Sequence, residues 1–248
     1  MSELPVDLIG ALDAAAATER LLVTSDFDGT LAPIVNNPAD ARPLPQAAEA
    51  LAALAELPST SVALISGRAL SVLRELSGAP STVHLVGSHG AEFDTGFAHH
   101  VDEVLLARIA AALKAIAADR PGVTVETKPA SVALHVRNAS AADGEAALRE
   151  ARTAAESWDA HATEGKAVLE LAVISTDKGE AVDIMRAQSD ATAVVFLGDD
   201  VTDEKAFRRM RDADVGVKVG PGPTLAAYRI DAPDDVAAVL AYLLQTRR

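Results

Sequence analysis

The sequence predicts an α/β protein in which a core built on a parallel sheet carries a smaller α/β domain inserted into the chain. Toward both ends of the chain, short apolar runs that finish in polar residues alternate with helical segments, which is the pattern of βαβ units. Between these regions, apolar and polar residues alternate with period two, as in half-buried antiparallel strands. We therefore expect a discontinuous core of residues 1–98 and 175–248 and an inserted domain of residues 99–174.

The first part of the core is predicted to contain three buried strands that alternate with helices. Its elements in chain order are a helix at Val6–Arg20, a strand at Leu21–Val23, a proline-rich loop after Leu31, a helix at Gln46–Leu57, a strand at Ser61–Ile65, a helix at Ala69–Leu76 and a strand at Val83–Val86. The first strand leads to Asp26 and Asp28, and the second leads to Ser66. Because ligands collect at the carboxyl ends of strands in open α/β sheets, we expect these side chains to face one crevice.

The inserted segment is predicted to be an α-β-β-α-β-β domain with one face of its sheet available. Its expected elements are, in order, Val104–Ala118, Val123–Glu126, Val132–Val136, Ala141–Trp158, Asp159–Thr163 and Ala167–Val173. The core pattern then resumes. Its expected elements are a helix at Asp177–Gln188, a strand at Ala193–Leu197, a helix at Thr202–Arg211, a strand at Asp214–Val219 and a helix at Asp234–Gln245.

Composition excludes several classes of function. A net charge of −14 argues against nucleic acid or an anionic membrane as the main partner. The absence of cysteine excludes disulfides, zinc–thiolate sites and a thiol nucleophile. No apolar run reaches the roughly 20 residues of a membrane span, and the start lacks the features of a signal peptide, so we expect a cytoplasmic protein without a membrane partner. We also expect a monomer.

The polar residues at the strand ends match the needs of a phosphoryl-transfer site that uses a carboxylate nucleophile. Asp26 and Asp28 are two residues apart, so in an extended chain their side chains lie on the same side. A carboxylate and a phosphate repel each other, so a divalent metal held by acidic oxygens and a lysine are needed between them. Asp199 follows the strand at Ala193–Leu197, and Lys178 opens the helix that resumes the core. A hydroxyl such as that of Ser66 can hold the other phosphate oxygens.

Each of these residues also has a simpler interpretation. An aspartate followed by glycine is often only a turn, Ser66 or Asp203 can cap the helix that follows it, and a single lysine such as Lys178 is usually a solvated surface residue. Such groups occur here at three strand ends and at one helix start, which is much harder to obtain by chance. The combination therefore favours a phosphoryl-transfer site.

Four short motifs, DFDGT, SGR, DKG and GDDVTDE, follow one another along the chain. They match in order the four motifs of the haloacid dehalogenase-like (HAD) phosphohydrolases, which the chain therefore resembles. The inserted domain is similar to the type-2 cap of that superfamily. The resemblance implies a three-layer, Rossmann-like core. It further implies that Asp26 is the nucleophile that forms an aspartyl-phosphate and that Asp28 is the acid and base. Ser66 would bind phosphate, and Lys178 would pair with the nucleophile and the phosphate. Mg²⁺ would be held by Asp26, the Asp28 carbonyl and Asp199, and Asp200 and Asp203 are further metal-site candidates between which the motif does not decide.

Four longer stretches are VGSHGAE, ETKPASVALHVR, EGKAVLEL and GDDVTDEKAF. They resemble the corresponding stretches of the trehalose-6-phosphate phosphatases within that superfamily. The residues that the resemblance places around a sugar phosphate are Gly67, Arg68, His89, Lys128, Ser131, His135, Arg137, Lys166 and Glu170. A disaccharide presents many hydroxyls, which charged and amide groups bind well. The alternative for Lys166 and Glu170 is a solvated ion pair on an exposed sheet face.

The resemblance implies a Mg²⁺-dependent phosphatase that hydrolyses trehalose 6-phosphate to trehalose and phosphate, so that the expected partner is a small-molecule sugar phosphate. Two alternatives stay open from the sequence. One is a HAD sugar phosphatase of broader specificity. The other is a sugar-phosphate sensor without catalysis, although Asp26, Asp28 and Lys178 are all present.

Overall fold

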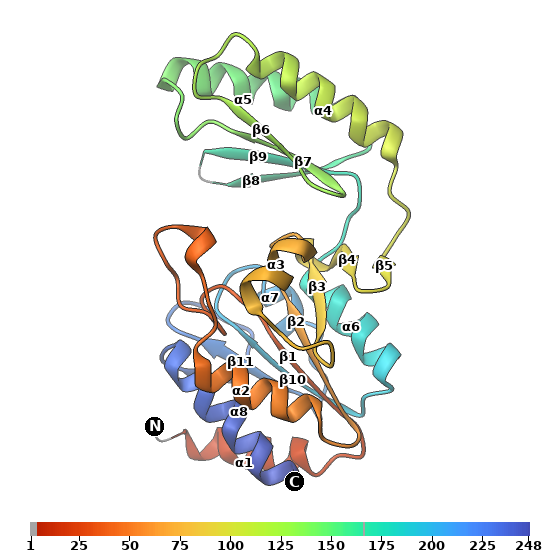
Figure 1. Cartoon of the computed structure of the whole chain (residues 1–248), viewed down its shortest axis with the longest axis vertical. Coiled ribbons are helices and arrows are strands. Elements are labelled where there is room, and N and C mark those ends of the chain that lie inside the picture. The colour runs from red at the N-terminus through yellow and green to blue at the C-terminus, as the bar shows by residue number, and fades with distance from the viewer. Residues whose placement is uncertain (1–3, 166) are drawn as a thin grey trace. The chain divides into compact units, whose positions relative to one another are not determined.

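The computed structural model describes residues 4–165 and 167–248, and the chain divides into two compact units (Figure 1). One unit is formed by Met1–Gly96 together with Thr176–Arg248, and the other by Phe97–Ser175. The first unit has a mainly parallel sheet between helices, and the second has a small antiparallel sheet of its own. The α/β fold predicted from the sequence is therefore confirmed.

Within the described residues, the larger sheet has eight strands in the order β12-β11-β10-β1-β2-β3-β4-β5. Their bounds are Leu21–Ser25 (β1), Thr60–Ile65 (β2), His84–Gly87 (β3), Glu92–Phe93 (β4), Gly96–Phe97 (β5), Ala193–Gly198 (β10), Val215–Val219 (β11) and Tyr228–Ile230 (β12). The pairs from β12 across to β3 are parallel, and β3 pairs with β4 in the antiparallel sense. β1 lies between β10 and β2, so its carboxyl end is at the centre of the sheet.

Helices cover both faces of this sheet. They are Val6–Ala16 (α1), Pro45–Ala55 (α2), Leu70–Ser77 (α3), Lys178–Ser189 (α6), Glu204–Phe207 (α7) and Pro233–Arg247 (α8), with short 3₁₀ turns at Pro38–Asp40 and Ser88–Gly90. In Figure 1, α1, α2 and α8 lie together on one side of the sheet and α6 lies on the other. All five residues of β1 are buried as a result, which is the burial that a continuous apolar run in a parallel strand predicts.

The second unit is a four-stranded antiparallel sheet in the order β6-β7-β9-β8, with two helices on one face (Figure 1). Its elements are Glu103–Ala117 (α4), Thr124–Thr127 (β6), Ser131–His135 (β7), Ala141–Ala155 (α5), His161–Gly165 (β8) and Val168–Ala172 (β9). Alternate residues such as Val132, Leu134, Leu169 and Leu171 are buried in a separate core with the helices. The polar residues between them therefore lie on the opposite face of the sheet.

Several elements of the structure differ from the sequence prediction. β12 and the short strands β4 and β5 were not predicted, because each has only two or three residues and lacks a recognisable apolar run. The helix predicted at Thr202–Arg211 is only Glu204–Phe207. It starts late because the Asp203 carboxylate accepts a hydrogen bond from the amide of Asp200, which holds these residues in a turn.

Among the helices of residues 4–165 and 167–248, none has the length and apolar character that a membrane span requires.

Candidate active site

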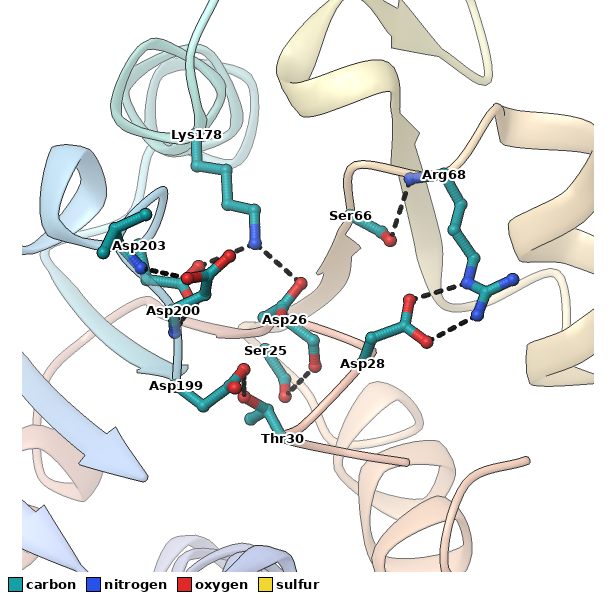
Figure 2. Close-up of polar contacts among 11 residues, drawn as sticks. Ser25, Asp26, Asp28, Thr30, Ser66, Arg68, Lys178, Asp199, Asp200 and Asp203 are labelled. Atoms are coloured by element: carbon teal, nitrogen blue, oxygen red, sulfur yellow. Dashed lines mark hydrogen bonds and ion pairs between the residues drawn. The ribbon is translucent and has the colours of Figure 1, made fainter. Parts of the chain in front are cut away.

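Asp26 and Asp28 lie directly after β1, in a tight loop at the carboxyl edge of the larger sheet (Figure 2). The loop is closed by hydrogen bonds from the amide of Ala32 to the carbonyl of Phe27 and from the amide of Gly29 to the carbonyl of Ala32, both 2.7 Å. Gly29 has a φ of 86°, and a Cβ atom on it would lie 2.2 Å from an oxygen of Asp199. Glycine is therefore required here for the turn and for the approach of Asp199.

Lys178 connects the end of β1 with the loop after β10. Its Nζ atom donates hydrogen bonds of 2.7 Å to Asp26 Oδ1 and 2.7 Å to Asp203 Oδ1, and all three side chains are buried (Figure 2). Lys178 is the first residue of α6, whose start is capped by Asp177. Burial alone would lower the pKa of Lys178, but the two carboxylates outweigh it and raise that pKa. The lysine is therefore a fixed positive charge between two acids.

Asp26, Asp199 and Asp203 form an acidic cluster in which one carboxylate oxygen of each lies within 4.8 Å of the others. Burial is the main cause that raises the pKa of Asp26, to about 8, and the charges of Asp203 and Asp199 add to it while Lys178 opposes it. Burial and the charge of Asp203 also raise the pKa of Asp199. One lysine thus does not offset three carboxylates. Oxygen ligands with excess negative charge suit a hard divalent cation, so the residues fit such a metal.

Asp200 lies outside this cluster. Its carboxylate accepts a hydrogen bond of 2.6 Å from the amide of Val201, and its own amide donates to Asp203 Oδ2 at 2.9 Å. Between the two candidates that the sequence left open, the structure therefore places Asp203, and not Asp200, beside the other acids.

Ser66 and Arg68 follow β2 at the same edge of the sheet (Figure 2). Ser66 Oγ accepts a hydrogen bond of 3.2 Å from the amide of Arg68. The guanidinium of Arg68 donates from Nε and Nη2 to the two carboxylate oxygens of Asp28, each at 2.6 Å. The Cζ atom of Arg68 lies 5.8 Å from the centre of the Phe27 ring. The bond with Asp28 raises the pKa of Arg68. The structure thus brings Asp28 and Arg68 together as a bidentate ion pair.

Gly67 and His89 also lie at this edge. The His89 ring packs so closely on Gly67 that a Cβ atom on the glycine would lie 2.4 Å from His89 Cε1. The short loop of Ser66, Gly67 and Arg68 is therefore in contact with the turn after β3.

A second polar cluster lies in the other unit, on the sheet face that α4 and α5 do not cover. Glu170 of β9 accepts hydrogen bonds from Lys128 Nζ at 2.9 Å and from Ser131 Oγ at 2.6 Å. His135 Nε2 lies 2.9 Å from Glu126 Oε2. These residues share one face because β6, β7 and β9 are neighbours whose alternate side chains point the same way.

Arg137 and Lys166 were also predicted to belong to this site. Arg137 is exposed and lies beyond the end of β7, in a turn. Lys166 lies outside the described residues.

Comparison with known proteins identifies the family. A family model described as Trehalose-phosphatase matches residues 24–233, which is most of the chain. The chain belongs to the trehalose-phosphatase family. The matched range includes both the acidic cluster after β1 and β10 and the polar face of the smaller sheet.

Curated members of the trehalose-phosphatase family are similar along nearly the whole chain. The trehalose-phosphate phosphatase of Mycobacterium leprae is 35% identical over 96% of this chain and 61% of its own length. That of Mycobacterium avium is 37% identical over 94% of this chain and 65% of its own length. The chain thus spans about three-fifths to two-thirds of the length of these relatives.

Solved structures of trehalose-phosphatase proteins share the fold. The C-terminal domain of the C. albicans trehalose-6-phosphate phosphatase superposes with a TM-score of 0.76 at 24% identity, over 98% of this chain and 99% of that one. The trehalose-6-phosphate phosphatase of Aspergillus fumigatus gives 0.73 at 25% identity, over 99% and 100% of the two chains. The fold of both units is therefore that of the family.

Two residues beside the acidic cluster were missed by reasoning from sequence. Thr30 Oγ1 donates to Asp199 Oδ1 at 3.1 Å, and the buried Lys218 of β11 donates from Nζ to the main-chain carbonyl of Asp199. Both residues have a feature in the sequence that could have identified them. Thr30 belongs to the DFDGT motif, and Lys218 is the single charged residue in an apolar strand, near its carboxyl end.

Proposed function

We propose that the chain is a Mg²⁺-dependent phosphatase that hydrolyses trehalose 6-phosphate to trehalose and phosphate. The observation that carries the proposal is the position of Asp26, buried at the end of the central strand, within hydrogen-bonding distance of Lys178 and beside Asp199 and Asp203. Trehalose-phosphate phosphatases that are 35 to 37% identical to the chain support the choice of substrate.

In the proposed first step, a carboxylate oxygen of Asp26 attacks the phosphorus atom and the bond to the sugar oxygen breaks. The leaving oxygen takes a proton from Asp28, which yields trehalose and an aspartyl-phosphate. In the second step, Asp28 accepts a proton from a water molecule as that water attacks phosphorus. Phosphate is released and Asp26 is free again.

The attacking group must be ionised, and burial works against this because it raises the pKa of Asp26 to about 8. Lys178 offsets part of that cost through its 2.7 Å hydrogen bond. Asp26, Asp199 and Asp203 are the side chains that would hold Mg²⁺, and the ion would supply the remaining positive charge for Asp26 and the phosphate oxygens. The role of the Asp28 carbonyl as a further ligand stays a prediction from the resemblance.

Arg68 and Asp28 give the proposed reaction an order of events. Both oxygens of Asp28 accept hydrogen bonds from the guanidinium, so neither is available to the leaving oxygen of a substrate. A phosphate dianion near Ser66 attracts the same guanidinium and so competes with Asp28 for it. Substrate binding would therefore release the Asp28 carboxyl from Arg68, so that it can reach the leaving oxygen.

The sugar is proposed to be recognised by the polar face of the smaller sheet, through Lys128, Ser131 and Glu170, with His135, Arg137 and Lys166 as further candidates. Glu170 already holds a lysine and a serine, so its carboxylate is oriented before a ligand arrives. Charged and hydroxyl groups on one sheet face match the many hydroxyls of a disaccharide. The cytoplasmic location and the monomeric state stay predictions from the sequence.

The proposal is tested by phosphate release from purified protein with trehalose 6-phosphate, glucose 6-phosphate and a mannosyl phosphate, each with Mg²⁺ and with a chelator. Release from trehalose 6-phosphate, at a kcat/KM at least about tenfold above that of the others, is the expected result. Equal rates on all three substrates would favour the broader sugar phosphatase. Binding of trehalose 6-phosphate without turnover would favour the sensor.

A further inference from the structure

Two non-glycine residues after β3 have an unusual backbone conformation. Ser88 has a φ of 49° and His89 a φ of 55°, and they are followed by Gly90 with a φ of 107°. Glycine adopts such angles freely, whereas serine and histidine do so at a cost in free energy. Strain of this kind persists only where surrounding contacts hold it, and it is concentrated at functional sites. The left-handed backbone of this turn therefore needs a structural explanation.

The strained turn holds both ends of the Ser66–Arg68 loop. The amide of Ser88 donates a hydrogen bond of 2.7 Å to the carbonyl of Arg68, and the amide of His89 donates one of 2.9 Å to the carbonyl of Ser66. Two consecutive amides can reach these two carbonyls because the left-handed angles point them toward the same loop. The loop between them contains Gly67, on which the His89 ring packs.

The same turn also packs against the start of α6. A Cβ atom on Gly90 would lie 2.8 Å from the carbonyl of Asp177, the residue that precedes Lys178. The turn thus lies between the loop that carries Ser66 and Arg68 and the helix that carries Lys178. A change in the conformation of the turn would therefore displace both that loop and the start of α6.

The side chains of Ser88 and Glu92 hold the turn in this conformation. Ser88 Oγ donates a hydrogen bond to Glu92 Oε1, and Glu92, in β4, is only 7% exposed. A hydroxyl bound to a buried carboxylate makes a stronger hydrogen bond than one between neutral groups. Neither residue belongs to the four core motifs, and neither was among the predicted site residues.

We propose that Ser88 and Glu92 are positioning residues for phosphate binding: their hydrogen bond holds the left-handed turn, and the turn fixes the Ser66–Arg68 loop that receives the phosphate group. The inference rests on the proposed function in that it takes this loop as the phosphate-binding element. It adds two residues that act through the position of this loop.

The test compares variants of these residues in the full chain with Mg²⁺ present. Two quantities are measured: the Kd for inorganic phosphate, by calorimetry, and the kcat and KM for trehalose 6-phosphate. Ser88→Ala loses the hydroxyl and keeps the backbone strain, so the Kd and the KM are expected to rise about tenfold, with a smaller change in kcat. Ser88→Gly also loses the hydroxyl but relieves the strain, so its effect should be smaller than that of Ser88→Ala.

Glu92 supplies the conservative rescue. Glu92→Gln keeps an oxygen acceptor of the same shape and is expected to stay within about threefold of the wild type, whereas Glu92→Leu should match Ser88→Ala. If Glu92→Leu does not fold, the two Ser88 variants and Glu92→Gln still decide the outcome. A Kd and KM for Ser88→Ala within about twofold of the wild-type values would overturn the inference.

Asp94→Asn is the matched control for a general loss of stability. Asp94 follows β4 and accepts hydrogen bonds from the amide of Leu85 and from Arg74, outside the turn. Asp94→Asn should lower the Tm without changing the affinity for phosphate. If Asp94→Asn loses as much phosphate affinity as Ser88→Ala, then Ser88 and Glu92 have only a structural role.

Wild-type protein that binds phosphate but leaves trehalose 6-phosphate intact would contradict the proposed function alone. Wild-type protein that does not bind phosphate would contradict this inference as well.

Discussion

Arg68 donates two hydrogen bonds of 2.6 Å to the two carboxylate oxygens of Asp28. The pair joins the loop after β2 to the loop after β1, and both loops carry residues proposed to act on the phosphate group. A planar guanidinium fits a carboxylate and a phosphate equally well. We therefore expect Arg68 to exchange Asp28 for the phosphate group when a substrate binds.

Arg68→Met should lower kcat/KM for trehalose 6-phosphate by at least about tenfold, because the phosphate loses a bidentate donor. Steady-state kinetics measures the effect. Arg74→Met is the control, since Arg74 pairs with Asp94 on the surface. Unchanged kinetics in Arg68→Met would show that the guanidinium plays no part in binding or in the release of Asp28.

Lys178→Met should lower the free energy of unfolding, because it leaves the buried Asp26 and Asp203 without their shared cation. The expected loss is about 3–5 kcal/mol in urea denaturation with a chelator present. The loss should be larger at pH 9 than at pH 6, because burial raises the pKa of Asp26 to about 8 and its protonation at pH 6 relieves the repulsion with Asp203. Lys205→Met, at an exposed lysine of α7, serves as the control. A loss below about 1 kcal/mol would contradict the buried ion pairs.

Binding of Mg²⁺ should release a proton near neutral pH. Without the metal, burial raises the pKa of Asp26 from 3.8 to about 8, so the carboxyl is largely protonated at pH 7. A bound cation favours the ionised form, and about one proton is expected to leave at pH 7 and almost none at pH 9.5. Calorimetry in two buffers of different ionisation enthalpy measures this number. Asp26→Asn should abolish the proton release. Binding of Mg²⁺ to the wild-type protein at pH 7 without release of a proton would contradict the raised pKa of Asp26.

Glu170→Ala should separate sugar recognition from chemistry. The KM for trehalose 6-phosphate is expected to rise by about tenfold or more, because Lys128 and Ser131 lose the carboxylate that orients them. The kinetics with p-nitrophenyl phosphate, which has no sugar, should stay within about twofold. Glu164→Ala is the control, because Glu164 pairs with Arg152 on the helix-covered face of the same sheet. Equal effects on both substrates would argue against a sugar site at Glu170.

The strand ends were the most predictable part of this site. Asp26, Ser66 and Asp199 follow apolar runs, and parallel strands bring their carboxyl ends to one edge, so sequence alone indicated that these side chains meet. The contact of Lys178 with Asp26 came from the motif match, because nothing in a lone lysine at a helix start shows that it is buried.

The residues that sequence did not resolve depend on the course of single turns. Asp203 joins the acidic cluster instead of Asp200 because the turn before α7 points its carboxylate at Lys178. Ser88 and Glu92 were within a quoted motif, but a left-handed backbone at a serine cannot be read from residue type. The strand β12 was missed because its three residues include the exposed Arg229.

The central claim is that Asp26 is the nucleophile of a metal-dependent phosphatase, and phosphate release from trehalose 6-phosphate by wild-type and Asp26→Asn protein tests it most directly. The wild-type protein should release phosphate with Mg²⁺ and stop when a chelator is added. Asp26→Asn should keep its circular dichroism spectrum and lose at least about a thousandfold in kcat. Turnover by Asp26→Asn near the wild-type rate would contradict the account.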